Sequence, residues 1–297
     1  MASVVQLQRS NEQVALLSDE VQQQLARWNR ERLEPRLPDS QWQVAIDHDA
    51  AMLRLQGEFI ETLRKQVAER AAEAPRDADA FILWFENLET TGPGQHDPLF
   101  RWLELEADLV QTRWYLTQEA AGEAGFDDLT AYAQVKLPVR IKLELARNYW
   151  DEMGRGNEKG MHGPMLHRLV EHLRIEPRIE DTVWESLALA NAMTAMATRR
   201  DYAWHALGAL GVVELTAPGR SAAVAAGLKR LGVKAKDRLY FDLHAVLDVK
   251  HSAAWNAEAL APAVAEDPRR AAAIAEGALI RLECGARCFE RYRRELW

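Results

Sequence analysis

The chain has 297 residues, of which 48% are hydrophobic and 28% charged, and this composition excludes a largely disordered protein because it supplies ample apolar material for a core. The net charge of −8 gives no general attraction to nucleic acid or to an anionic membrane, so we expect neither partner. The N-terminus lacks a long apolar segment, and no other stretch approaches about eighteen uninterrupted apolar residues, which argues against secretion and membrane spanning.

Periodicity predicts an all-α fold. Apolar residues recur at three- and four-residue intervals, and β-branched alternation is hard to find. The first helix is expected from about Asn11 to Leu33, because Pro35 and Pro38 prevent its continuation. A long second helix is expected from Trp42 to about Ala72, and a short third helix around residues 81–85.

The segment Thr90–Gly94 is the clearest break in the first part of the chain, and we place a domain boundary there. Residues 1–94 are interpreted as an N-terminal helical extension, a lid or a dimerisation element, and residues 95–297 as the main domain. The extension is compatible with a homodimer. Further helices are expected near residues 99–121, 129–132, 139–153, 163–173, 181–197, 202–215, 221–231, 237–260 and 268–295.

The two cysteines, Cys284 and Cys288, are four residues apart in the last expected helix, where a disulfide along one helix face has poor geometry. A reduced, cytoplasmic protein is therefore expected.

The clearest chemical signal is the trio His244, Asp248 and His251. With about 3.6 residues per turn, positions i, i+4 and i+7 share one stripe of a helix, so the three side chains can converge on one point. A lone helical histidine is more often solvated or hydrogen-bonded in a core, but three potential ligands at this spacing favour a metal site. Apolar neighbours place the helix inside a bundle, where a divalent cation, or a His–Asp hydrogen bond, would offset the cost of burying these groups.

Further donors lie upstream of this trio. Glu152 and Glu214 are each expected at the C-terminal end of a helix, where the macrodipole disfavours an anion unless a cation is near. His162 follows Glu152 after a glycine-rich break. Each of these three residues alone is a weak signal, since a glutamate at a helix end is usually solvated. Together with the trio they form a carboxylate-rich set that suits iron or manganese better than zinc.

The order of these six residues, with the flanking segments Asn148–Gly154 and Tyr240–His244, resembles the haem-oxygenase-like diiron oxidases, also called iron-containing redox enzymes. The resemblance covers roughly residues 96–297, and its most specific part is the His-x3-Asp-x2-His string that ends at His251. It implies a haem-oxygenase-like helical bundle that binds two Fe²⁺ ions and no haem.

The resemblance also implies a division of the ligands between the two irons. One iron would be held by Glu152, His162, Glu214 and His244. The second would be held by Asp248 and His251, with a carboxylate bridging the two ions.

The family has one further carboxylate on an earlier core helix, for which this chain offers Glu119 and Glu123. We favour Glu119, because Glu123 lies close to the break at Gly122 and Gly125. The spacing does not decide between the two.

The activity implied by the resemblance is that of a non-haem diiron oxidase or oxygenase that uses O2 to oxidise a small organic substrate, such as an amino acid, an amine or a fatty acid. An external electron donor is compatible with this activity, and no catalytic side chain beyond the ligands is assigned. His205 is expected in the core or as a hydrogen-bond partner that orients a ligand.

Two alternatives remain: a metal-free enzyme on the same bundle, such as a thiaminase-like hydrolase with a cysteine nucleophile, and a non-catalytic helical metal-binding protein. Cys284 and Cys288 are poor nucleophile candidates, since no matching catalytic constellation accompanies them.

Overall fold

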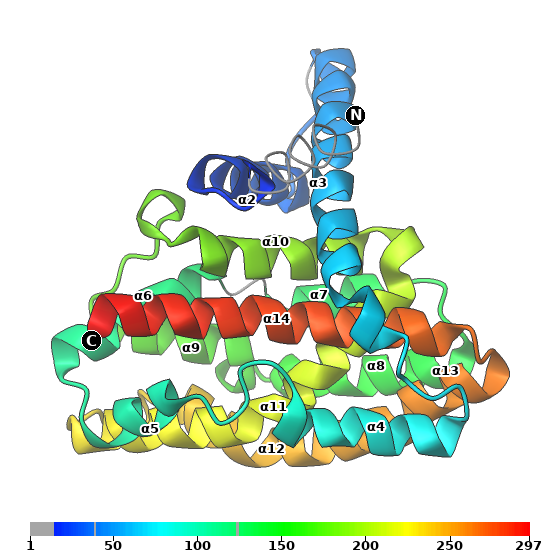
Figure 1. Ribbon diagram of the computed structural model, residues 1–297. Helices are drawn as coiled ribbons and strands as arrows, with labels where there is room; N and C mark the ends of the chain where they lie inside the picture. The colour runs from blue at the N-terminus through cyan, green and yellow to red at the C-terminus, as the bar shows by residue number, and fades with distance from the viewer. Residues whose placement is uncertain (1–14, 39, 123–124) are drawn as a thin grey trace, which may run out of the picture.

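The computed structural model describes residues 15–38, 40–122 and 125–297, and it is drawn in Figure 1. Within these ranges the regular elements are helices, and the β-type pairing is limited to an isolated bridge between Met153 and Met161. The predicted all-α fold is confirmed.

The N-terminal helices are α2 (Asp19–Leu33), α3 (Trp42–Ala71) and α4 (Ala78–Thr91). Ser18 caps α2 and Asp77 caps α4, each through a side-chain oxygen that accepts a backbone N–H of the first turn. The expected start of the first helix at Asn11 lies outside the described residues. In Figure 1, α3 crosses α14 steeply and rises out of the bundle, with α2 beside it.

The middle of the chain forms α5 (Pro98–Leu105), α6 (Leu109–Gly122), α7 (Phe126–Ala133), α8 (Val139–Glu152) and α9 (His162–His172). The prediction of a single helix over residues 99–121 is wrong, because Asp108 and Gln111 form a capping box that starts α6 anew. The Asp108 carboxylate accepts the Gln111 N–H at 2.8 Å, and the Gln111 side chain accepts the Asp108 N–H at 3.0 Å.

The C-terminal half forms α10 (Trp184–Thr198), α11 (Ala203–Arg230), α12 (Leu239–Trp255), a π-helical turn (Asn256–Leu260), α13 (Ala261–Glu266) and α14 (Arg270–Leu296). Short 3₁₀ turns lie at Gly154–Gly156, Glu158–Gly160, Ile179–Asp181 and Arg200–Tyr202. The expected break between residues 215 and 221 is wrong, because α11 continues through Pro218. Proline removes one helical hydrogen bond, but buried packing along most of α11 holds the helix on both sides of it.

Helix α11 is the centre of the bundle and packs against α5, α10, α12 and α14. Glycines allow the closest of these approaches. A Cβ atom on Gly208 would lie 1.9 Å from the carbonyl oxygen of Ile274 in α14, and one on Gly277 would lie 1.9 Å from that of His205 in α11. The two backbones therefore touch at this crossing, which fixes how α11 lies against α14.

The N-terminal helices share the core of the rest of the chain. Leu25, Phe59 and Phe85 belong to the same buried cluster as Leu207 of α11 and Leu279 of α14. The division into two domains at residue 94, and the role of the first part as a lid or dimerisation element, stay predictions.

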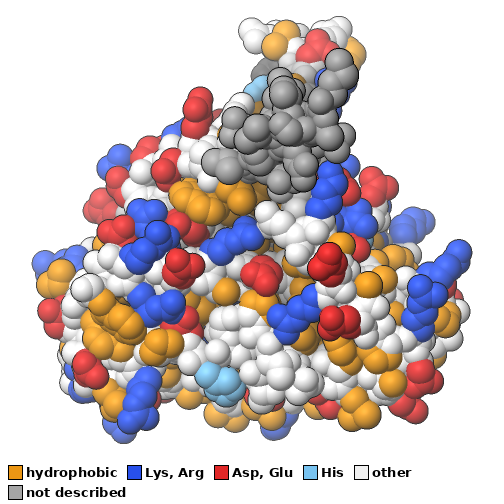
Figure 2. All heavy atoms as spheres, in the orientation of Figure 1, with side chains coloured by type: hydrophobic (Ala, Val, Ile, Leu, Met, Phe, Trp, Pro, Cys, Tyr) orange, Lys and Arg blue, Asp and Glu red, His pale blue; other side chains and the backbone are white. Residues whose placement is uncertain are grey.

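Among the described helices, none combines the length and apolar content that crossing a bilayer requires. On the face shown in Figure 2, basic and acidic side chains are interspersed, with hydrophobic side chains between them.

Candidate metal centre

Helices α8 and α9 bring Glu152 and His162 together. Glu152 is the last residue of α8, His162 is the first of α9, and the turn between them folds back on itself. This turn requires glycine at Gly154, where φ is +59° and a Cβ atom would lie 2.3 Å from the carbonyl carbon of Gly160. The result is that Oε2 of Glu152 lies 2.6 Å from Nδ1 of His162.

Helix α12 contributes His244, Asp248 and His251 from successive turns of one face. Nδ1 of His244 lies 2.6 Å from the carbonyl oxygen of Tyr240, so this nitrogen carries the proton and Nε2 is the one left to bind a cation. The His244 ring lies edge-on to that of His162, with 4.6 Å between the ring centroids.

Helix α11 contributes Glu214. One of its carboxylate oxygens accepts a hydrogen bond from Nδ2 of Asn148 at 2.6 Å, and the other lies 3.5 Å from Nδ1 of His251. The expectation that Glu214 ends a helix is wrong, because α11 is continuous and this glutamate lies in its buried middle. A macrodipole penalty therefore applies to Glu152 at the end of α8 but not to Glu214.

The six predicted residues form two groups of three, and the ligand atoms within each group lie within 4.8 Å of one another. The first group is Glu152, His162 and His244, and the second is Glu214, Asp248 and His251. The division differs from the predicted one, since Glu214 lies with Asp248 and His251. All six side chains are buried except that of His244, which is half-buried.

Several of the potential ligand atoms in these two groups have no hydrogen-bond partner in the described part of the chain, as expected of atoms that bind a cation. Nδ1 of His162, Nδ1 of His251 and Oδ1 of Asp248 are buried and make no hydrogen bond to any described residue. Nδ1 of His162 is near Glu152 but lacks the angles of a hydrogen bond. An unpartnered buried polar atom costs about 1–3 kcal/mol, and a bound cation in each group would remove that cost. Carboxylates combined with imidazoles are also the types of ligand that di-iron sites in helical bundles use.

Burial and neighbouring charges shift the pKa values of three of these side chains. Burial, together with the negative charges of Glu214 and Glu152, raises the pKa of Asp248 to about 9. Burial acts to lower the pKa of His251, but Glu214 and Asp151 outweigh it and raise that pKa to about 9. Burial lowers the pKa of His244 to about 4, so this imidazole is neutral and able to bind a metal at neutral pH.

Two positioning residues were missed by the sequence analysis. Asp151 has a carboxylate oxygen 3.2 Å from Nε2 of His251, and the other oxygen accepts Nε of Arg155 at 2.6 Å. This contact leaves Nδ1 of His251 facing Glu214, as a histidine ligand requires. Asn148, which holds Glu214, is one helical turn before Glu152. That spacing was visible in the sequence and could have identified Asn148.

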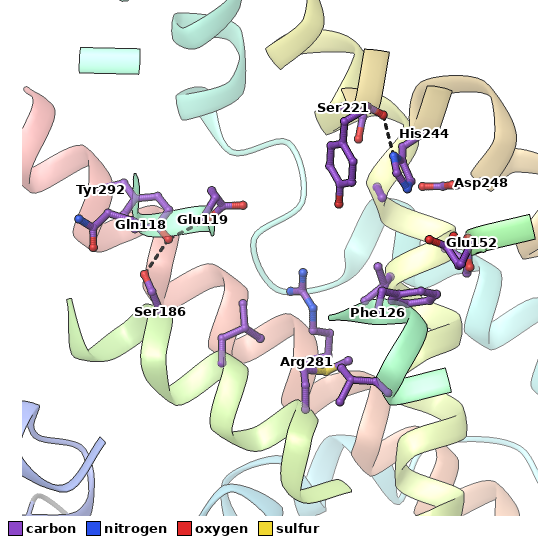
Figure 3. Close-up of a pocket in the computed structure, with 17 residues that line it drawn as sticks. Gln118, Glu119, Phe126, Glu152, Ser186, Ser221, His244, Asp248, Arg281 and Tyr292 are labelled. Carbon is purple, nitrogen blue, oxygen red and sulfur yellow. Dashed lines mark hydrogen bonds between the residues drawn. The ribbon is translucent and has the colours of Figure 1, made fainter. Parts of the chain in front are cut away.

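Glu119 lies apart from both groups. Figure 3 shows it on the opposite side of the pocket from His244 and Asp248, where it accepts a hydrogen bond from the Tyr292 hydroxyl at 2.9 Å. The structure therefore does not place Glu119 as the seventh ligand, and Glu123 lies outside the described residues. Of the two expectations for His205, the structure agrees with the core position, since the side chain is buried and its Nε2 lies 2.9 Å from the carboxylate of Glu276.

A cavity of about 140 Å³ borders both groups. Glu152, Glu214, His244 and Asp248 line one end of it. The remaining walls combine apolar side chains, such as Phe126 and Leu189, with polar ones, such as Ser221 and Arg281. A small molecule in this cavity would lie directly beside both ligand groups.

A family model described as an iron-containing redox enzyme matches residues 113–286. This span contains all six residues of the two groups. A search of curated proteins finds no match. Among solved structures, a CADD-like protein of unknown function from Nostoc punctiforme is similar, with a TM-score of 0.53 and 16% identity over 80% of this chain and 97% of that chain. At this identity the similarity shows a shared fold.

Proposed function

The chain belongs to the iron-containing redox enzymes, and on that premise we propose that it is a non-haem diiron oxidase that uses O2 to oxidise a small organic substrate. The haem-oxygenase-like bundle predicted from the sequence is the fold of this chain. The observation that carries the proposal is that two groups of three candidate ligands, five of the six buried, border one cavity. Bound there, iron would supply the electrons for the reduction of O2.

The protein's own contribution is to fix the ligands before the reaction. The Tyr240 carbonyl oxygen sets the tautomer of His244, Asp151 holds the ring of His251, and Asn148 holds the carboxylate of Glu214. Because the cavity borders ligands of both groups, a substrate held there would be close to both ions.

The test begins with iron content. Replacing His244 by Ala removes one of three donors from the first group, so the purified His244→Ala protein should contain much less iron than the wild type. His172→Ala is the matched control, because that side chain is exposed and pairs with Asp237 outside the site. Equal iron loss in the two variants would contradict the ligand assignment.

The second measurement concerns O2. Anaerobic ferrous protein is mixed with O2 in the presence of amino acids, amines or carboxylic acids, and the proposal expects one class to accelerate oxygen consumption. A protein that takes up no iron would instead support a metal-free enzyme on this bundle. Iron binding without substrate-accelerated oxygen consumption would support a non-catalytic metal-binding protein.

A further inference from the structure

The cavity at the metal centre continues into a second compartment of about 150 Å³. Several residues line both compartments, among them Glu119, Tyr240 and Arg281. Arg220 lies in the second compartment, away from the metal ligands. The combined space therefore has the two ligand groups at one end and two arginines toward the other.

Both arginines present unpartnered donors. Nη2 of Arg220 and Nη1 of Arg281 are buried, and neither guanidinium forms an ion pair or hydrogen bond with another residue in the part of the chain that the structure describes. The Arg220 guanidinium lies 5.2 Å from the ring centroid of Phe289 and 5.8 Å from that of Phe100. These cation–π contacts position the charge but leave its N–H groups free to bind a ligand.

The position of Arg281 depends on a glycine one helical turn later. A Cβ atom on Gly285 would lie 2.8 Å from Nη1 of Arg281, so the absence of a side chain there leaves room for the guanidinium. Burial, with repulsion from Arg281, lowers the pKa of Arg220 to about 9, which still leaves it cationic at neutral pH. Two like charges are thus held inside the protein.

The charges at this end of the cavity do not balance. Glu119 is the carboxylate that lines both compartments, and it accepts its hydrogen bond from Tyr292 rather than from an arginine. Burial raises the pKa of Glu119, so two guanidinium groups with this one carboxyl group leave a surplus of at least one positive charge. A bound monoanion would reduce this surplus, whereas a zwitterionic amino acid would leave it unchanged. A carboxylate also matches the planar fork of a guanidinium group.

We propose that Arg220 and Arg281 bind the carboxylate of a monocarboxylic acid substrate, whose apolar body extends toward the two ligand groups. The carboxylate would then be anchored away from the metals, and a carbon further along the molecule would face them. Leu189 and Val213, which line both compartments, supply apolar contacts between the two ends. The identification of this ligand as the substrate rests on the proposed function. The existence of the binding site depends only on the two arginines and the cavity.

The test is calorimetric titration of the anaerobic iron-loaded full-length protein with hexanoate, octanoate, decanoate and 3-phenylpropanoate, each compared with its primary amide. The acids should bind about ten- to a hundredfold more tightly than the amides, as expected for hydrogen bonds to charged groups. Arg220→Gln and Arg281→Gln should lose most of this preference. Arg287→Gln is the matched control, because Arg287 bonds Gln66 and lines neither compartment.

A further variant covers the case in which loss of a buried arginine prevents folding. Gly285→Ala keeps both charges and favours the helix, but it displaces Nη1 of Arg281, so it should weaken acid binding in a protein that still melts cooperatively. Three results would overturn the proposal: equal affinity for acids and amides, tighter binding of α-amino acids than of acids with the same carbon skeleton, or an acid preference that persists in both arginine variants. The last would mean that the metals bind the carboxylate.

Iron content and oxygen consumption of the same wild-type preparations separate this inference from the proposed function. Acid preference without oxygen consumption would support the anion site and contradict the oxidase. Oxygen consumption without a preference for acids would support the oxidase and contradict the anion site.

Discussion

Burial determines the chemistry of the two cysteines as it does that of the two proposed ligand groups. Cys284 and Cys288 are 2% and 0% exposed, and burial raises the pKa of Cys284 to about 11 and that of Cys288 well above its usual range. Both are therefore thiols, not thiolates, at neutral pH. This state counts against the alternative of a cysteine nucleophile.

We expect native protein at neutral pH to resist alkylation by iodoacetamide at both cysteines, and denatured protein to react at both. Mass spectrometry of the intact chain measures the number of added groups. Rapid modification of the native protein at either cysteine would mean that the thiol is accessible and ionised, and it would restore the cysteine-nucleophile alternative.

At the scale of elements, the crossing of α11 and α14 sets the position of Glu214. Gly208→Ala should lower the free energy of unfolding by about 1–3 kcal/mol or more, because the new Cβ would lie 1.9 Å from the Ile274 carbonyl oxygen and would push the helices apart. Gly219→Ala on the same helix is the control. A Cβ atom there meets no atom within 4 Å, so this change should stabilise the protein by roughly 0.5–1 kcal/mol.

Urea denaturation followed by circular dichroism would give both free energies. If Gly208→Ala were as stable as Gly219→Ala, the close contact between α11 and α14 could not be what fixes the bundle.

At the scale of the whole molecule, the proposed metal binding would be linked to pH. In the metal-free protein, Asp248 and His251 have pKa values raised to about 9 from 3.8 and 6.5, so between pH 6.5 and about 9 the folded state holds more protons than the unfolded state. The contribution of these two groups to stability is therefore present at lower pH and is lost as pH rises through about 9. The pKa of His244 is lowered to about 4 from 6.5, so this group makes stability rise with pH, but only below pH 6.5.

The melting temperature of chelator-treated protein should thus fall as pH rises from 6.5 to 9. Bound metal needs deprotonated ligands and binds the folded state, so adding Fe²⁺ anaerobically should raise the melting temperature most at the alkaline end of this range. A metal-induced increase that is the same at every pH would contradict the linkage. His172→Ala should behave like the wild type, since its ring lies outside the site.

The sequence by itself determined what depends on local periodicity. The helical fold and the common face of His244, Asp248 and His251 follow from spacing along the chain. The pairing of Glu152 with His162 was implied by the family resemblance. The start of α6 after Asp108 is also encoded locally, in the capping box of Asp108 and Gln111.

Only the tertiary structure decided which helix faces meet. Periodicity identifies the buried face of a helix but not the neighbour that covers it, which here depends on backbone contacts such as that at Gly208. This is why Glu214 belongs with Asp248 and His251, and why Glu119 lies across the cavity from them. For the same reason the sequence could not predict the proximity of Arg220 and Arg281. These residues are distant in sequence and line one cavity because α11 and α14 pack together.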